Sequence, residues 1–191
     1  MRPMDAAKQP VTVLAGRYGH PVHPVLVAVP IGAWVASVVF DLASYVVPDP
    51  AFLAQGSRWL IGLGVLGALV AAAVGFLDLL AVPRRTRAFR TAMVHMSFAL
   101  GVTGLYAVGF ALRSDPVAPV PWPMVALSAV ALVALTVTGY LGGTLAYRYG
   151  VRVADEHTQA TGFHVASPPE TTSTDPSSTP GPPSTTPKEN D

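Results

Sequence analysis

Residues 59–82 read WLIGLGVLGALVAAAVGFLDLLAV, a run with a single charged side chain, Asp78. A helix that crosses the roughly 30 Å of bilayer hydrocarbon needs about 20 apolar residues. Three other runs meet this requirement, at 25–47, 92–112 and 123–147. Each run is apolar on all sides, whereas a helix at the surface of a soluble bundle keeps a polar stripe. The sequence therefore predicts an all-α fold, an integral membrane four-helix bundle spanning residues 25–153.

The composition agrees with a membrane protein and excludes several other classes. Of 191 residues, 51% are hydrophobic and 12% charged, whereas a soluble domain carries about 25% charged residues. The net charge is +1, and the arginines form short clusters rather than a broad basic face, so we expect no nucleic-acid partner. The chain has no cysteine, which excludes disulfides, thiolate nucleophiles and cysteine-ligated clusters. The predicted partner is the lipid bilayer.

Basic residues flank the four runs unevenly. Two connections, those after the first and third runs, hold only Arg58 and Arg113. The other flanks hold eight basic residues: Lys8, Arg17, Arg84, Arg85, Arg87, Arg90, Arg148 and Arg152. By the positive-inside rule, both termini are predicted to be cytoplasmic. The excess of arginine over lysine, ten to two, favours a bacterial source and hence a bacterial cytoplasmic membrane. Segment 1–24 is then cytoplasmic, and its apolar stretch is too short for a signal peptide.

The C-terminal residues 154–191 are rich in proline, serine and threonine. Such a composition buries too little apolar surface to offset the entropy lost on ordering. We predict a disordered cytoplasmic tail, in which His157 and His164 are solvated and are not ligands.

Small residues recur at a spacing of four inside two of the runs. Gly139 and Gly143 form one such pair, and Ala71 and Gly75 form another. This spacing lets helix backbones approach closely in lipid. It predicts a tight bundle or a homo-oligomer.

No motif of hydrolytic enzymes is present. We find no nucleophile–base pair, no phosphate-binding loop after a strand and no HExxH helix. Gly62, Gly64 and Gly67 spell GxGxxG, but they lie within an apolar run with no preceding strand. We expect no hydrolytic activity, while a redox role leaves the enzyme question open.

Three ionisable side chains lie inside the runs: Asp41, Asp78 and His95. An ionisable group in hydrocarbon costs a few kcal/mol, so its presence indicates a partner or a function. The directions of the runs place Asp78 and His95 near the cytoplasmic end, where the first run begins and the fourth ends. The predicted polar layer there comprises His20, His23, Asp78, His95, Tyr147 and Arg148.

Two interpretations of this layer stay open. In one it is structural: Asp78 is neutralised by Arg148 or by the loop arginines, and His95 bonds a carbonyl group. In the other, the bundle binds b-type haem and passes electrons to other membrane or redox proteins. His95 and His23 are then the axial ligands, His20 is a further candidate, and Arg148 pairs with a propionate.

Other possibilities rank below these two. Zinc or copper is less favoured than haem, because His20 and His23 flank a proline and need not chelate together. A small transporter or proton pathway through Asp78 and His95 is a further alternative, but no polar residue continues the path at the midplane.

Two more residues of the first run carry predictions. Asp41 stands apart from the layer, and we expect a structural role in which it pairs with Arg58 or with the hydroxyls of Ser37 and Ser44. Pro30 has no N–H to offer the carbonyl of Leu26, which predicts a kink.

The stretch Gly19-His20-Pro21-Val22-His23-Pro24, followed by 30–34 (PIGAW) and 40–42 (FDL), resembles the opening of a bacterial membrane family catalogued as domain of unknown function 2231. Residues 139–143 (GYLGG) and 147–150 (YRYG) resemble its end. The resemblance implies a four-helix membrane domain over about residues 17–153. Some members carry a Rieske-type domain, which implies a redox setting. Tyr149 stands where many members have a histidine.

Overall fold

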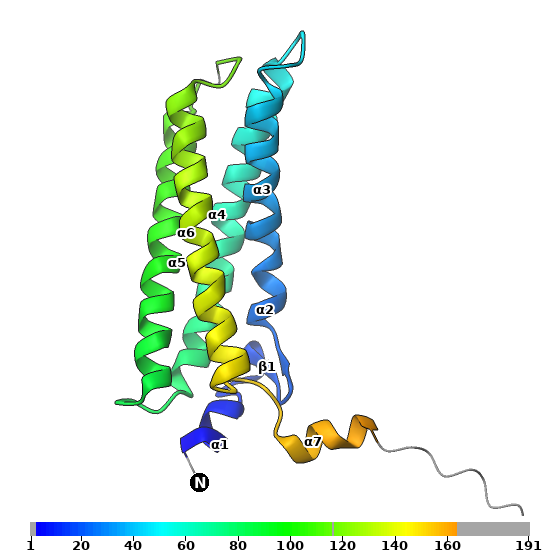
Figure 1. Cartoon of the computed structure of the whole chain (residues 1–191), viewed down its shortest axis with the longest axis vertical. Helices are drawn as coiled ribbons and strands as arrows, with labels where there is room; N and C mark the ends of the chain where they lie inside the picture. The colour runs from blue at the N-terminus through cyan, green and yellow to red at the C-terminus, as the bar shows by residue number, and fades with distance from the viewer. Residues whose placement is uncertain (1–2, 116, 164–191) are drawn as a thin grey trace, which may run out of the picture.

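The computed structural model describes residues 3–115 and 117–163, and its main feature is an elongated bundle of four helices (Figure 1). Each of the four is long and apolar enough to cross a membrane. They are α2–α3 (His23–Leu26 and Ala28–Ala43), α4 (Ala51–Leu80), α5 (Arg87–Leu112) and α6 (Trp122–Gly143), which continues as a π-helical turn, η2 (Thr144–Arg148). The predicted all-α membrane bundle is confirmed.

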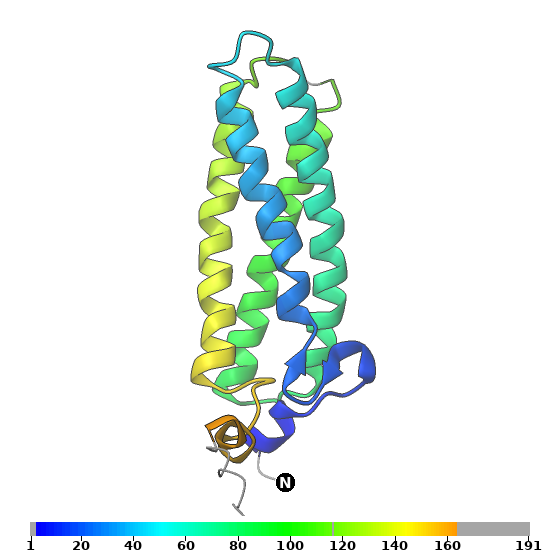
Figure 2. The ribbon, with the colours of Figure 1, turned by 90° about the vertical axis from the view of Figure 1, so that its right-hand side faces the viewer.

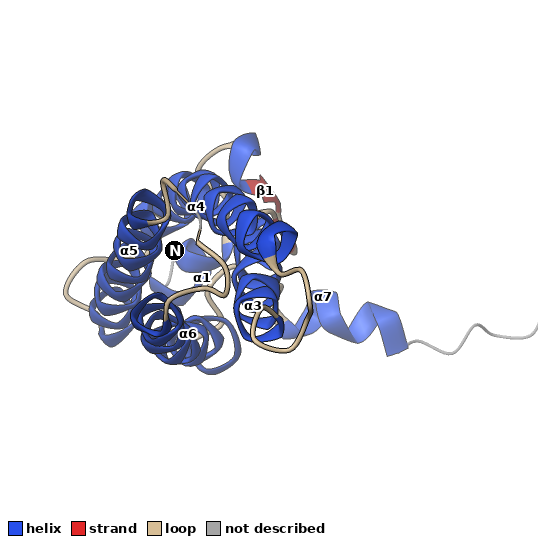
Figure 3. Ribbon diagram, turned by 90° about the horizontal axis from the view of Figure 1, so that it is seen from above, coloured by secondary structure: helices blue, strands red, loops and turns tan. Residues whose placement is uncertain are grey.

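Short elements gather at one end of the bundle (Figure 2). Those before the first span are α1 (Pro3–Lys8), η1 (Val13–Ala15), β1 (Gly16–Arg17) and β2 (His20–Pro21); those after the last are α7 (Glu156–Ala160) and η3 (Thr161–Phe163). The two strands pair antiparallel. We call this the basic end, because the arginines of the turn between α4 and α5 also lie here. Seen along the bundle, the four spans follow one another around a ring (Figure 3).

Local sequence explains where the spans begin and break. The side chain of Thr86 accepts a hydrogen bond from the backbone N–H of Phe89, which caps α5 and starts it before the predicted residue 92. The first span is interrupted at Val27, between α2 and α3. This break lies where the missing N–H of Pro30 frees the carbonyl of Leu26, as expected.

The core is a stack of two aromatic rings at the centre of the bundle. Trp34 of α3 and Tyr106 of α5 lie parallel, with ring centroids 4.2 Å apart and planes 8° apart. Ile61, Val102 and Ala131 complete this buried cluster. All four spans therefore contribute to one core, which fixes their rotation about their own axes.

Glycines of α4 make room for side chains of the neighbouring helices. A Cβ at Gly64 would lie 2.2 Å from the Trp34 ring, and a Cβ at Gly62 would lie 2.8 Å from the Phe110 ring. The GxGxxG spacing thus serves helix packing in this fold. Gly139 differs, because a Cβ there would meet nothing within 4 Å.

The tail prediction needs correction at its start. Residues 155–160 form a capped helical turn, since the side chain of Asp155 accepts a hydrogen bond from the backbone N–H of Thr158. Side chains that bond the first free N–H groups of a helix stabilise it locally. The remainder of the predicted disordered tail, residues 164–191 with His164, lies outside the described residues.

Candidate functional site: a histidine pair above an arginine-centred network

Arg152 organises the basic end. Its Nε lies 2.7 Å from a carboxylate oxygen of Asp78 in α4, and both side chains are largely buried. The contact is an ion pair rather than an aligned hydrogen bond. The guanidinium also donates to the carbonyls of Ala15 at 2.7 Å and Lys8 at 3.4 Å. One arginine thus neutralises a membrane carboxylate and holds the N-terminal segment against the bundle.

Backbone geometry supports the same arrangement. Arg152 has a φ of 61°, a left-handed conformation that non-glycine residues seldom adopt. Its own N–H donates to the carbonyl of Ala7 at 3.0 Å, and Lys8 donates to the carbonyls of Val153 and Ala154, each at 3.3 Å. The segments before the first span and after the last are therefore bonded to each other in both directions.

His23 and His95 lie next to each other within the bundle, close to this network. Their ring centroids are 6.4 Å apart and the ring planes are perpendicular. His23 comes from the start of α2 and bonds the carbonyl of Ala71 in α4 through Nδ1, at 2.8 Å. His95 comes from α5 and bonds the carbonyl of Thr138 in α6 through Nδ1, at 3.0 Å. Each imidazole therefore links two spans.

These bonds fix the tautomer of both rings. A carbonyl can only accept, so Nδ1 carries a proton, and in the neutral form of each ring Nε2 keeps a free lone pair. Within the described residues no hydrogen bond involves either Nε2. Metal-binding histidines are commonly anchored in this way, with the second nitrogen bonded to a carbonyl or a carboxylate.

Two glycines provide the space for the imidazoles. A Cβ at Gly75 would lie 2.9 Å from Cε1 of His23, and a Cβ at Gly142 would lie 3.2 Å from Cε1 of His95. Both distances are shorter than ordinary van der Waals contact, so a larger residue would displace the rings. The small residues in α4 and α6 thus have a local purpose at this pair.

Two neighbouring imidazoles whose Nε2 atoms have no hydrogen-bond partner among the described residues are a donor set that haem iron accepts. Neither surface pocket at the basic end is lined by His23 or His95. A porphyrin would therefore require neighbouring side chains to move. In the described part of the chain, no three His, Asp or Glu side chains converge on one metal position.

The other members of the predicted layer do not join the pair. His20 is exposed in β2 and lies 3.4 Å from the carbonyl of Tyr18. Tyr147 is 91% exposed, and Arg148 is also exposed. Both belong to the π-helical turn η2, whose changed winding alters the direction in which side chains point. The predicted pairing of Asp78 with Arg148 or the loop arginines is wrong, since its partner is Arg152.

The expected partners of Asp41 also need correction. Asp41 is fully buried and pairs with Arg113 at 2.8 Å, not with Arg58. The hydroxyls of Ser37 and Ser44 donate to backbone carbonyls instead. Sequence reasoning missed Arg113 and Arg152 because it counted them as flanking charges. Arg113 lies one residue beyond a helix, and Arg152 lies just after a turn. These positions were the available signal that their side chains could fold back against the bundle.

Comparison with known proteins agrees with this architecture. No curated protein and no solved structure matches the chain. The family model described as predicted membrane protein (DUF2231) matches residues 19–155, a region that contains all four spans, the histidine pair and the residues of the Arg152–Asp78 ion pair. The chain therefore belongs to this family of predicted membrane proteins, domain of unknown function 2231.

Proposed function

We propose that the His23–His95 pair is the functional centre of the bundle and holds a b-type haem for electron transfer within the membrane. One observation carries the proposal: two imidazoles from different spans lie next to each other, each with Nδ1 bonded to a carbonyl and with Nε2 unpartnered among the described residues. Paired imidazoles of this kind on facing helices are a common ligand set for haem in helical bundles.

The chain's own residues would have separate duties. His23 and His95 would supply the imidazole nitrogens that hold the iron, and Arg148, exposed at the same end, would supply a cation for a propionate. The Asp78–Arg152 ion pair, with the hydrogen bond from Arg152 to Ala15, keeps the N-terminal segment bonded to this end. When bound, haem supplies one-electron oxidation and reduction, with a potential set by its ligands and surroundings.

Visible absorption of the purified full-length protein tests the proposal. Protein from haem-replete cells should show a Soret band that sharpens on reduction with dithionite. His23→Ala and His95→Ala should each abolish it, while His157→Ala, which removes an exposed imidazole of α7, should leave it unchanged. A folded wild-type protein that stays colourless after haem is added would refute haem binding.

A second candidate is a structural or partner-binding membrane protein without a cofactor. It is favoured by the fact that both imidazoles already join two spans through hydrogen bonds. The ion pair of Asp41 and Arg113, far from the histidines, likewise ties spans together without any candidate ligand. A colourless protein that loses stability in His23→Ala and His95→Ala would favour this function. No observation favours a proton pathway through Asp78 and His95, because Asp78 is held by Arg152.

A further inference from the structure

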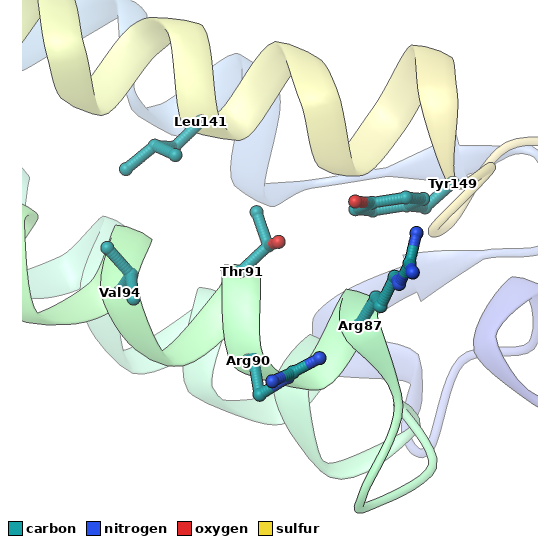
Figure 4. Close-up of a pocket in the computed structure, with 6 residues that line it drawn as sticks. All are labelled: Arg87, Arg90, Thr91, Val94, Leu141 and Tyr149. Carbon is teal, nitrogen blue, oxygen red and sulfur yellow. The ribbon is translucent and has the colours of Figure 1, made fainter.

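A pocket of about 340 Å³ lies at the basic end between the start of α5 and the end of α6. It is lined by Arg87, Arg90, Thr91, Val94, Leu141 and Tyr149 (Figure 4). None of these residues belongs to the histidine pair or to the Arg152 network. The pocket is therefore a separate feature of the bundle.

The lining changes from polar to apolar along the pocket. In Figure 4 the ring of Tyr149 lies close to the Arg87 side chain, and the hydroxyl of Thr91 points into the space beside them. Val94 lies one helical turn further along α5, facing Leu141 of α6, and its side chain is 47% exposed. The polar part adjoins the end of the spans, and the apolar part adjoins the surface that faces lipid.

The two arginines have no carboxylate partner in the part of the chain that the structure describes. The arginine ion pairs there are those of Arg113 with Asp41 and of Arg152 with Asp78. The sequence has no acidic residue between Asp78 and Asp115. Two neighbouring cations at the first turns of a helix, where the helix dipole is positive, favour an anionic ligand.

We propose that this pocket binds the phosphate of an anionic phospholipid. Arg87 and Arg90 face the phosphate, the hydroxyls of Thr91 and Tyr149 donate to its oxygens, and an acyl chain follows Val94 and Leu141. Basic pockets between spans at the cytoplasmic side are a common form of site for lipid headgroups. The apolar continuation of the pocket favours a lipid over a soluble phosphate, which would leave Val94 and Leu141 uncovered.

Native mass spectrometry of the full-length protein tests this site. The protein is equilibrated in detergent with phosphatidylglycerol or with zwitterionic phosphatidylcholine, and the retained lipids are counted. We expect clear preference for phosphatidylglycerol in the wild type and a loss of about fivefold in its affinity for each arginine removed in R87Q/R90Q. The matched control R84Q/R85Q removes two exposed charges from the same turn outside the pocket and should keep the preference.

Two charge-neutral variants separate a built site from diffuse attraction. Thr91→Val and Tyr149→Phe keep the net charge but each removes one hydroxyl, and each should weaken phosphatidylglycerol binding about threefold. Equal losses in R84Q/R85Q and R87Q/R90Q, or no loss in either hydroxyl variant, would overturn the proposal. Inorganic phosphate is added in a final arm. If millimolar phosphate releases the lipid and binds with the same dependence on Arg87 and Arg90, the site takes soluble phosphate and the lipid assignment fails.

Discussion

Asp41 and Arg113 form a buried ion pair, 2.8 Å long, near the end of the bundle opposite the basic end. Asp41 lies in α3, and Arg113 lies directly after α5. The hydroxyl of Ser57 in α4 donates to Asp41, and Arg113 donates to the hydroxyl of Ser128 in α6 at 3.2 Å. A single ion pair therefore connects all four spans: it joins α3 to the end of α5 directly, and it joins α4 and α6 through one hydroxyl each.

Breaking this ion pair should destabilise the bundle. Asp41→Asn leaves the guanidinium of Arg113 buried without its counter-charge, which costs about 3 kcal/mol in comparable buried pairs. The free energy of unfolding, measured by titration with sodium dodecyl sulfate, should fall by about that amount. Asp49→Asn, at an exposed position in the next turn, is the control and should change it by less than about 0.5 kcal/mol. Similar values for both variants would show that the pair contributes little.

The glycines beside the imidazoles should be intolerant of a methyl group. Gly75→Ala places Cβ 2.9 Å from His23, and Gly142→Ala places it 3.2 Å from His95. We expect each to lower the free energy of unfolding by about 1–3 kcal/mol, the closer contact by more. Gly101→Ala, where a Cβ meets nothing within 4 Å, should be neutral or stabilising by up to about 1 kcal/mol. Equal effects at all three positions would contradict the packing described.

Loss of the Arg152 side chain should release the N-terminal segment. Arg152→Gln removes the cation that bonds Asp78 and the carbonyl of Ala15, and charge-assisted hydrogen bonds contribute about 1.5–3 kcal/mol each. Trypsin cleavage after Arg17, followed by mass spectrometry, should become at least about tenfold faster. The exposed Arg148→Gln serves as the control and should cleave at the wild-type rate. Unchanged cleavage in Arg152→Gln would mean that other contacts hold the segment.

Acid should release the link between the N-terminal segment and α7. The backbone N–H of Thr158 and, less strongly, the hydroxyl of Tyr18 bond the carboxylate of Asp155 and lower its pKa below the usual 3.8. Because the pKa of Asp155 is lower in the folded state, the contribution of this carboxylate to stability is fully present above pH 3.8. It is lost as the pH falls through the folded-state pKa. The amide NMR signal of Thr158 should titrate with a midpoint below 3.8 and should not titrate in Asp155→Asn. A midpoint at or above the usual value would be inconsistent with these bonds.

The sequence predicted the spans well because hydrocarbon length and apolar composition are strong, local constraints. The first span broke where Pro30 indicated. Helix starts were less well placed, since caps such as Thr86 lie outside the apolar runs that define a span. The short helix α7 was missed because one Asp155 cap is a weaker signal than the surrounding composition.

The sequence predicted at which depth along the spans the candidate-site residues lie, but not in which direction their side chains point. The order of spans placed His23 and His95 at a similar level, and the structure brings them together. Depth alone also grouped Tyr147 and Arg148 with them, although the π-helical turn exposes both. The partner of Asp78 could not be inferred, because Arg152 reaches it only after the chain turns back beneath the bundle through its left-handed backbone conformation.

The position of Arg152 also has a consequence for biosynthesis. This residue follows the last span, while its carbonyl partners Lys8 and Ala15 precede the first. A ribosome releases residue 152 only after all four spans have been made. The hydrogen bonds that hold the N-terminal segment to Arg152 can therefore form only after the whole membrane domain has been translated.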